Sequence, residues 1–481
     1  MTRQPPRRAT PLHAASLALL LAGPALAQTP PVGVPEAASA AALPAGPMTL
    51  FQLTDFALRH HPEAQAAWSL AQEDVARVAA AQALLRPVVS ATVPLTAAHG
   101  RAPAGGTASA SPGGVTYGLA PAIGLSWVLF DGGARASGVE AARWQAAASQ
   151  LTYNRALQTL VSDVEQRYYA LLTARQLEAA LQVGVAAAQA SVDVAKARRN
   201  EGLATVGETS QAEAALGQAQ LAAVQAHATS RSASGALADA IGAPVDAELS
   251  LVDEDRFDAL SPAGRLDDLL QLARASRADL AALSAQVRQA RAEVDAAQAQ
   301  GRPSLSFGAT AARTWSRDGG NTTSAASQQV GLTLSIPIFD GGLVRAQTQA
   351  ARARLQAATA QRELQRQAVD LDVWQSYQFA DSSEATVNAA QAALRSATVA
   401  EDAARARYRS GVGLLIELLA AQTTAAQARA SLVQARYDGL LALARLGYAI
   451  GANGVATTRA AANGLRPSPD PLSPSPHPPV R

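Results

Sequence analysis

The chain has 481 residues, of which 48% are hydrophobic but only 4% aromatic. Small apolar side chains, mainly alanine, favour slender, closely packed helices over a thick globular core. The formal net charge is +2 and no Lys/Arg cluster lies beside aromatic residues, which argues against nucleic-acid binding. The absence of cysteine excludes disulfides, thiolate metal sites and a lipid-modified cysteine.

The amino terminus has the pattern of a secretory signal peptide over residues 1–27. Three arginines among the first eight residues precede an apolar run at 14–22, and Ala25-Leu26-Ala27 fits an A-x-A cleavage site. An uncleaved membrane anchor is the alternative, but the apolar run is shorter than a membrane span requires. We therefore expect an exported chain from which this segment is removed.

After the signal, the sequence contains no candidate transmembrane helix. Such a helix needs about 18 consecutive apolar residues, and the nearest stretch, 411–421, is short and includes Glu417. A β-barrel is the other structure that satisfies the backbone polar groups in lipid. If this exported chain sits in a membrane, we expect it to use strands.

The sequence contains an internal repeat. The segment Phe130-Asp131-Gly132-Gly133 recurs 209 residues later as Phe339-Asp340-Gly341-Gly342. The same offset holds without a gap over more than a hundred residues, so a duplication explains it better than composition does. The other matching pairs are Arg143 and Arg352, Asp163 and Asp372, Tyr168 and Tyr377, Asp193 and Asp402, Gly202 and Gly411, Gln218 and Gln427, and Ile241-Gly242 and Ile450-Gly451.

Each copy has the same order of predicted elements. A helical stretch ends at Arg86-Pro87 or Arg302-Pro303, because proline disfavours the α conformation in the residue before it. Two strand-like segments follow, and the first copy has extra residues in the Gly- and Pro-rich segment 97–114, as expected of a loop. The predicted helical stretches are 54–85 and 266–300, and the predicted strands are 88–95, 115–129, 304–315 and 328–338.

A long helical hairpin is predicted after each strand pair. The Phe-Asp-Gly-Gly segments are expected to turn each strand pair into a helix, and the helical patterns at about 134–199 and 343–409 contain no proline. At 1.5 Å per residue each helix would be about 100 Å long, with apolar positions at coiled-coil intervals. Gly202 and Gly411 then interrupt the pattern, and a second helix returns in each copy.

These patterns divide the chain into five segments. The predicted segments are the signal peptide at 1–27, a flexible linker at 28–47, the first repeat at 48–245, the second repeat at 246–455 and a flexible Pro-rich tail at 456–481.

The four predicted strands of one chain cannot close a barrel, so several subunits would have to associate. Two, three or four chains would give eight, twelve or sixteen strands.

Over residues 50–453 the sequence resembles the TolC-like outer-membrane efflux proteins. The resemblance rests on the duplicated Arg-Pro strand entries, the Phe-Asp-Gly-Gly turns, and the hairpin tips Glu201-Gly202-Leu203 and Ser410-Gly411-Val412. It implies an α+β membrane protein in which a homotrimer forms one twelve-stranded β-barrel, four strands from each chain, continued by an α-helical coiled-coil barrel. It also implies a location in the cell outer membrane, extending into the periplasm.

The resemblance further implies a function. The protein would be a passive exit duct in a tripartite efflux or type I secretion system, fed by an inner-membrane transporter through a periplasmic adaptor. The competing hypothesis is a soluble periplasmic adaptor, or a coiled-coil interaction protein without a pore. That hypothesis predicts one hairpin within a β-domain, whereas the sequence has two hairpins, each attached to a strand pair.

The resemblance also implies functional residues near the hairpin tips. The family narrows its tunnel there with acidic side chains, and the matching positions are Glu417 and Glu208. A hydrogen bond from Tyr408 to Glu208 would hold neighbouring hairpins together. The alternative is that both glutamates are helix amino-terminal charges that favour the dipole. Gly413 stands where the family has an arginine. The tip residues implied to dock the adaptor are Gly202, Leu203, Gly411 and Val412.

We expect no catalytic group, cofactor or metal ion. Neighbouring histidines such as His60-His61 point about 100° apart on a helix, so a solvated helix end is favoured over a metal site. The paired glycines lack the Lys and Ser/Thr of a phosphate-binding loop. Four aromatic residues are expected at the two membrane interfaces, or alternatively packed at the barrel rim: Tyr117 and Trp315 at one end of the strands, Trp127 and Phe339 at the other.

Overall fold

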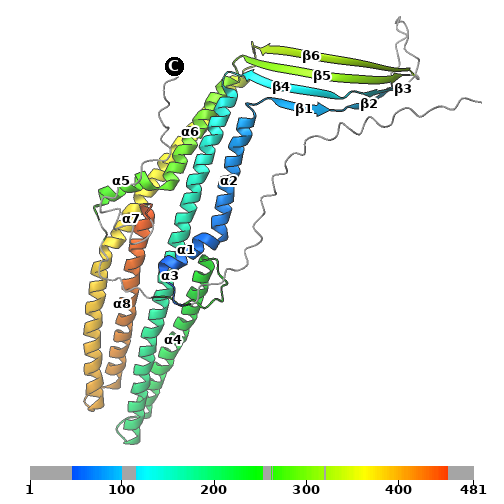
Figure 1. Cartoon of the computed structure of the whole chain (residues 1–481). Coiled ribbons are helices and arrows are strands. Elements are labelled where there is room, and N and C mark those ends of the chain that lie inside the picture. The colour runs from blue at the N-terminus through cyan, green and yellow to red at the C-terminus, as the bar shows by residue number, and fades with distance from the viewer. Residues whose placement is uncertain (1–45, 100–114, 253–261, 263, 319–320, 453–481) are drawn as a thin grey trace, which may run out of the picture. The chain divides into compact units, whose positions relative to one another are not determined.

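The computed structural model describes residues 46–99, 115–252, 262, 264–318 and 321–452. The predicted signal peptide, the Pro-rich tail, most of the linker and most of the loop at 97–114 lie outside these residues. The described residues belong to one compact unit, Pro44–Arg481 (Figure 1).

The helices repeat in order and in length. In each copy two shorter helices lead to the sheet, and a hairpin of two longer helices follows it (Figure 1). The first helix of each hairpin has 67 residues and the second has 35. The duplication is therefore confirmed at the level of structure. The helices are α1 (Leu50–His60), α2 (Pro62–Ala83), α3 (Ala134–Asn200) and α4 (Val206–Ala240), then α5 (Leu266–Ser276), α6 (Ala278–Ala299), α7 (Leu343–Arg409) and α8 (Leu415–Ala449).

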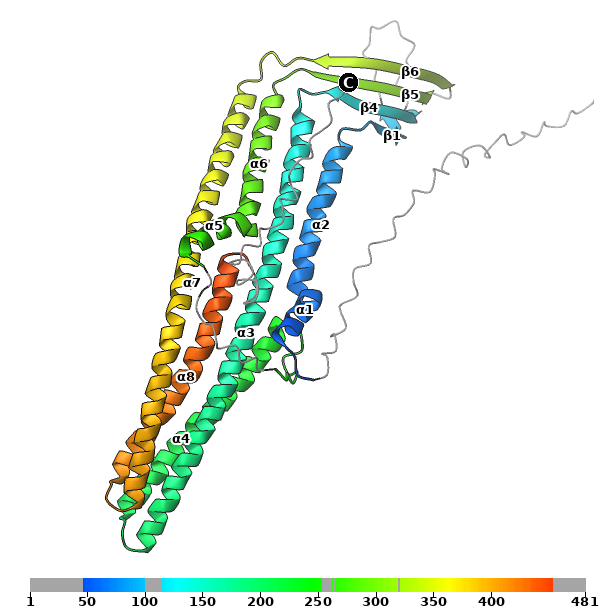
Figure 2. The same ribbon diagram turned by 60° about the vertical axis from the view of Figure 1, so that its left-hand side comes forward.

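The strands form one antiparallel sheet with four strand paths in the described residues (Figures 1 and 2). β1 pairs with β4 and β2 with β3, so these four short strands make two paths. Each path is interrupted at a proline, Pro94 or Pro121, which has no backbone N–H to donate. β5 pairs with β3 and β4 on one side and with β6 on the other. The strands are β1 (Val88–Thr92), β2 (Leu95–His99), β3 (Val115–Leu119), β4 (Ala122–Phe130), β5 (Ser304–Asp318) and β6 (Asn321–Ser335).

The last strand differs from its predicted bounds of 328–338. β6 begins earlier, at Asn321, because its polar first half pairs with β5 along the full length of that strand. It ends at Ser335, two residues before Pro337. Apolar alternation alone located only the second half of the strand.

The two predicted entry helices are each divided by a bend. His61 and Arg277 have extended backbone, with ψ of 128° and 120°. Pro62 accounts for the first bend, but no proline follows Arg277. A glycine packs against each bend: a Cβ on Gly242 would lie 3.3 Å from the Cα of His61, and one on Gly451 would lie 3.3 Å from the Cα of Arg277. Both glycines have positive φ, so glycine suits both positions.

Helix packing joins the two copies. α3 packs against α4 of its own hairpin and also against α6 and α8 of the second copy, while α7 packs against α6 and α8 (Figure 2). The buried residues between helices are predominantly alanine, with leucine and valine. The alanine-rich composition therefore allows close approach of long helices, as predicted.

Candidate functional site

The Phe-Asp-Gly-Gly segments lie between strand and helix in both copies. Asp131 accepts hydrogen bonds from the backbone amides of Gly133 (3.1 Å) and Arg135 (3.0 Å). Asp340 accepts from the amides of Gly342 (2.9 Å) and Val344 (2.8 Å). Each carboxylate thus occupies amides at the start of a 67-residue helix, which otherwise have no partner within the helix.

Among the described residues, arginine side chains hydrogen-bond at the first of these turns but not at the second. Arg135 donates to the carbonyl oxygens of Leu84 (2.7 Å) and Val128 (2.5 Å) and pairs with Asp131, so it ties α2, β4 and α3 together. Arg302 donates to the carbonyl oxygen of Gly132 at 2.7 Å. In the second copy Val344 stands in the place of Arg135, and Phe339 is 89% exposed. The remaining predicted turn residues are Phe130 and Gly341.

The hairpin tips present glycine followed by an exposed apolar residue. Gly202 and Gly411 have φ of +74° and +85°, the left-handed conformation that commonly ends a helix. Leu203 and Val412 follow them and are 67% and 79% exposed. An exposed apolar tip is a surface that a partner protein can cover.

The two glutamates implied as gate residues lie in the first turns of α4 and α8. Glu208 accepts a hydrogen bond from the amide of Thr205 (2.8 Å), while its own amide donates to the Thr205 hydroxyl (3.2 Å), which is a capping box. Glu417 is exposed and lies 3.9 Å from Arg407. Within one chain, both glutamates therefore occupy the position of a helix amino-terminal charge.

Tyr408 is buried between the two hairpins, with 1% of its surface exposed. Its hydroxyl has no hydrogen-bond partner in the described part of the chain, so the implied bond from Tyr408 to Glu208 is not formed within one chain. Burial is the main cause that raises the pKa of Tyr408; the Arg198 charge opposes this effect and the Glu208 charge adds to it. The phenol is thus neutral at physiological pH and close to a cation and an anion.

Arg198 is a residue of this site that sequence reasoning missed. Its guanidinium reaches from α3 to α7, donates to the carbonyl oxygen of Tyr408 at 2.7 Å, and lies 5.0 Å from the centre of the Tyr408 ring. A signal was present, because Arg198 and Arg407 are related by the repeat offset. No arginine can replace Gly413 without rearrangement, since a Cβ there would lie 2.9 Å from that of Arg407. The guanidinium that contacts Tyr408 across the hairpins is that of Arg198, from the first copy.

An apolar cluster surrounds this contact. Val192 and Ala195 of α3 pack with Tyr408 of α7 and with Leu415 and Leu418 of α8. Further from the tips, Gln422 donates to the hydroxyl of Ser191 at 3.0 Å, again joining α8 to α3. The two hairpins of one chain are thus packed together near their tips.

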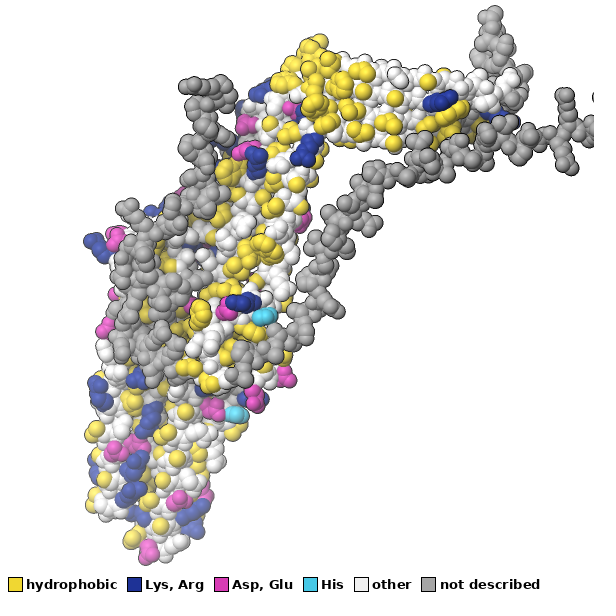
Figure 3. Space-filling model, in the orientation of Figure 1, with side chains coloured by type: hydrophobic (Ala, Val, Ile, Leu, Met, Phe, Trp, Pro, Cys, Tyr) yellow, Lys and Arg dark blue, Asp and Glu magenta, His cyan; other side chains and the backbone are white. Residues whose placement is uncertain are grey.

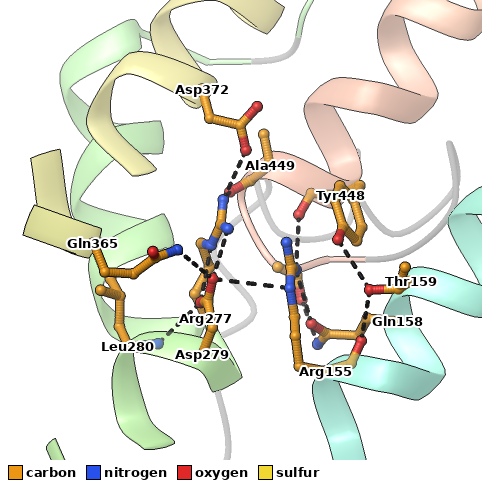
Figure 4. Close-up of polar contacts among 11 residues, drawn as sticks. Arg155, Gln158, Thr159, Arg277, Asp279, Leu280, Gln365, Asp372, Tyr448 and Ala449 are labelled. Carbon is orange, nitrogen blue, oxygen red and sulfur yellow. Dashed lines mark hydrogen bonds and ion pairs between the residues drawn. The ribbon is translucent and has the colours of Figure 1, made fainter. Parts of the chain in front are cut away.

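A second junction between the copies includes Arg155, in the first half of α3 (Figure 4). Arg277, at the α5–α6 bend, pairs with Asp279 (2.7 Å) and with Asp372 of α7 (2.9 Å) and donates to the carbonyl oxygen of Ala449 (3.0 Å). Arg155 of α3 stacks 3.9 Å from the ring centre of Tyr448. The same arginine lies 3.9 Å from Asp279 (Figure 4). One network thus connects α3 with α5, α6, α7 and α8.

The electrostatics of this junction are balanced. Burial disfavours the ionised form of Asp279, but hydrogen bonds and charge from Arg277, together with the charge of Arg155, hold the pKa of Asp279 below its usual range. Burial lowers the pKa of Arg155, and the positive charge of Arg277 adds to that effect. Both arginines stay charged, so the junction is a buried ion-pair network that joins the repeats.

The sheet has one apolar face and one polar face. Cross-strand partners share a face and successive residues alternate. All positions of β1 and β6 are exposed in the single chain. Figure 3 shows hydrophobic side chains gathered on the part of the sheet next to the helices. The apolar face carries Val89, Ile123, Leu125, Trp127, Leu305, Phe307, Ala309, Val330, Leu332 and Leu334, with the polar Thr322, Ser324 and Gln328 on the first half of β6. The opposite face carries Ser90, Gly124, Ser126, Ser306, Gly308, Thr310, Gln329, Gly331 and Thr333, together with Val88 and Val128.

Three of the four aromatic residues predicted at the membrane interfaces lie on the apolar face. Tyr117 and Trp315 are near the end of the sheet away from the helices, and their register with Arg317 and Leu119 places both on that face. Trp127 pairs with Phe307 toward the other end and donates to the carbonyl oxygen of Leu85 at 3.0 Å. Phe339 follows β6, outside the strand.

No helix in the described residues is long and apolar enough to cross a membrane. The same residues contain no group of three His, Asp or Glu side chains able to hold a metal ion. His60 contacts the carbonyl oxygen of Phe56 at 2.9 Å, and His61 accepts from the amide of Glu63 at 3.2 Å as the amino-terminal cap of α2. Both histidines thus have local structural contacts.

The duplicated hairpin and sheet units correspond to one known family. The family model described as outer membrane efflux protein matches residues 53–243 and 269–452. The chain belongs to this family. Its fold is therefore that of an α+β channel with two repeats, and its place is the cell outer membrane, from which it extends into the periplasm.

Curated relatives support the same assignment. Protein CyaE of Bordetella pertussis is 29% identical over 409 residues, which cover 83% of this chain and 85% of that protein. Outer membrane protein TolC of Escherichia coli is 26% identical over 316 residues, 63% of each chain. Alkaline protease secretion protein AprF of Pseudomonas aeruginosa is 31% identical over 183 residues, 37% of this chain and 38% of that protein.

Solved structures share the fold. The outer membrane protein VceC of Vibrio cholerae aligns with 84% of this chain and 96% of its own, with a TM-score of 0.70 and 20% identity. The outer-membrane channel OprN aligns with 84% of this chain and 90% of its own, with a TM-score of 0.73 and 21% identity. The family match and the curated relatives, together with this shared fold, show that the chain is an efflux or secretion channel protein rather than a soluble adaptor.

Proposed function

We propose that three copies of the chain assemble into one continuous exit duct. The observation that carries the proposal is the sheet, which has an exposed apolar face, an exposed polar face and two unpaired edges, at β1/β2 and at β6. Unpaired edges are not tolerated in lipid, so β6 of one copy would pair with β1 and β2 of the next. Three copies of four strand paths give twelve strands around a polar lumen.

The helices support the same assembly. α7 carries apolar side chains that a single chain leaves exposed, among them Leu364 (59%), Leu371 (54%) and Phe379 (67%). Exposed apolar surface of this kind is covered when neighbouring hairpins pack side by side. The six hairpins of a trimer would then form a helical barrel that continues the strands.

The hairpin tips would dock a periplasmic adaptor. Leu203 and Val412 are exposed at the tips, and Ile416 lies nearby with 63% exposed. Substrate would be supplied by an inner-membrane transporter, and the chain itself would act as a passive duct for efflux or type I secretion. AprF, a relative by sequence, is named for the secretion of a protease, which favours polypeptides as substrates.

The tips would also close the duct. Glu417, repeated three times, would form an acidic ring that repels itself and attracts cations. Tyr408 and Glu208 also lie near the hairpin tips. The contact of Arg198 with Tyr408 would hold the second hairpin against the first in the closed state. Opening would then require that contact to break.

The experiment that tests this proposal is single-channel recording of the purified full-length protein in planar bilayers, with its mass measured in the same detergent. We expect a trimer with a small, cation-preferring conductance. Glu417→Ala should weaken the cation preference, and Arg198→Gln should raise the conductance several-fold by loosening the closed state. Arg59→Gln, at an exposed ion pair on α1, is the matched control and should leave both unchanged.

One outcome would contradict the exit duct itself, and another would contradict only its closure at the hairpin tips. A folded, membrane-inserted assembly that conducts no ions would exclude an exit duct. A conducting trimer in which neither Glu417→Ala nor Arg198→Gln has an effect would retain the duct but place its closure elsewhere.

A further inference from the structure

The apolar face of the sheet carries two arginines at the end away from the helices. Odd-numbered residues of β5 continue on one face from Leu305 to Arg317, and the pairing of Arg317 with Tyr117 and of Trp315 with Leu119 shows that the face is unchanged at this end. Arg313 is therefore on the apolar face as well. Figure 3 shows Lys or Arg side chains beside hydrophobic ones toward this end of the sheet.

In the part of the chain that the structure describes, no acidic side chain pairs with either arginine. Arg313 and Arg317 are exposed, and no ion pair involves them among the residues that the structure describes. The guanidinium of Arg313 lies 5.1 Å from the centre of the Trp315 ring, which orients it but does not neutralise it. An arginine on a lipid-facing surface is costly at mid-depth and is accommodated only near an interface. These two side chains therefore need an anion, and none of the described side chains supplies one.

Their height on the sheet places them at an interface. From Leu305 to Trp315 the strand rises about 33 Å, which at a tilt of about 40° corresponds to roughly 25 Å along the membrane normal, the height of an outer-membrane apolar band. Trp315 would then mark the border of the hydrocarbon, and Arg317 with its cross-strand partner Tyr117 would lie just beyond it. Arg313, two residues lower, would extend its side chain toward the same level.

We propose that Arg313 and Arg317 bind the phosphate groups of lipid headgroups in the outward-facing leaflet. Guanidinium groups bind phosphate in a bidentate manner, and Trp315 and Tyr117 pack the adjoining acyl region. The outward orientation rests on the proposed function, in which the helices extend into the periplasm. Three copies of the pair would form a ring of six arginines around the barrel and would hold it at a fixed depth.

Native mass spectrometry of the purified full-length trimer tests this inference. The probes are lipid A, which carries two phosphates, and its monophosphorylated form. We expect wild type to retain diphosphorylated lipid A preferentially. The variant Arg313→Gln/Arg317→Gln should bind it about 30-fold more weakly, roughly fivefold for each charge removed near the membrane surface.

Two matched variants separate phosphate binding from loss of charge or of fold. Arg199→Gln/Arg409→Gln removes two charges in the last turns of α3 and α7 and should bind like wild type. Arg313→Lys/Arg317→Lys keeps the charge but not the bidentate geometry and should have intermediate affinity. If the glutamine variant does not assemble, the lysine variant decides by the same measurement.

Retention of lipid A by the glutamine variant at the wild-type level would overturn the inference, as would equal binding of the two lipid forms by wild type. Conductance measured on the same preparations separates this failure from failure of the proposed function. A conducting trimer without phosphate preference refutes only the lipid contact. A protein that never conducts refutes the duct.

Discussion

Among single residues, buried ionisable side chains differ in whether a group of opposite charge pairs with them. Arg277 is 5% exposed and has two carboxylate partners. Glu165 on α3 is 4% exposed, and burial alone raises its pKa to about 7. A carboxyl group in this state is neutral at mildly acidic pH and becomes a buried charge as the pH rises, so it should make folding depend on pH.

The sign of that dependence follows from linkage. The folded chain keeps the Glu165 proton between pH 4.5 and about 7, whereas the unfolded chain has lost it. Stability should therefore fall as the pH rises through this interval. Glu165→Gln should remove the fall and stabilise the protein at pH 8 by up to about 3 kcal/mol. Thermal unfolding followed by circular dichroism at pH 5 and pH 8 measures the difference.

The exposed Glu213 provides the control for this prediction. Its carboxylate is half exposed and pairs with Lys196 at 2.9 Å on the hairpin surface. Glu213→Gln should leave the pH profile as in wild type. Identical profiles for wild type and Glu165→Gln would show that Glu165 is not the group that titrates.

At the scale of elements, the bends in the entry helices explain how two repeats become one unit. Each bend receives a glycine from the end of the second hairpin helix of its own copy. Only the second bend carries an arginine, Arg277, and this arginine meets α7 and α8 while its partner Asp279 lies near Arg155 of α3. The duplicated scaffold is thus symmetric in backbone and asymmetric in charge, and the asymmetry joins the copies.

Removal of Arg277 should therefore be strongly destabilising. Arg277→Leu leaves Asp279 without its main partner in a largely buried site, which costs about 3 kcal/mol at neutral pH. Because the pKa of Asp279 is held below its usual range, the network stabilises the protein above that range and loses its effect as the pH falls through the lowered pKa. The unfolding midpoints of wild type and variant should thus converge in strong acid.

A matched comparison is available on α1. Arg59 pairs with Asp55 at 3.0 Å with both side chains largely exposed, and Arg59→Leu should cost less than about 1 kcal/mol. Equal effects of the two leucine variants would mean that the junction does not carry the coupling between the repeats.

For the whole assembly, the two faces of the sheet decide which surface faces lipid and which faces the lumen. Leu332 lies on the apolar face and Thr333 on the polar face, although they are neighbours in sequence. Leu332→Arg should destabilise membrane insertion by up to about 1 kcal/mol per chain, because Leu332 pairs with Phe307 near the border of the proposed apolar band, whereas Thr333→Arg should be tolerated in a wet lumen. The yield of folded oligomer in outer-membrane fractions, judged by mobility without heating, measures both.

The reverse result would be informative about the assembly. If Thr333→Arg abolished the oligomer and Leu332→Arg did not, the polar face would be the one turned outward, and the proposed lumen and lipid contact would both fail.

Elements that depend on local chemistry could be predicted from the residues alone. The repeat, the 67-residue helices and the Asp-Gly-Gly segments that precede them were all predictable, because proline, glycine and apolar periodicity act within a few residues. The match of the family model agrees with the predicted organisation into two hairpins on strand pairs.

Contacts between segments far apart in the chain could not be predicted and are known only from the three-dimensional arrangement. No proline follows Arg277, so the sequence does not predict a bend there. At the bend, Arg277 pairs with a carboxylate of α7 and donates to a carbonyl oxygen of α8. The first half of β6 is a strand because β5 pairs with it. The contact between Arg198 and Tyr408 joins residues 210 positions apart. Such contacts depend on which surfaces helix packing and strand register bring together, and no local pattern encodes that.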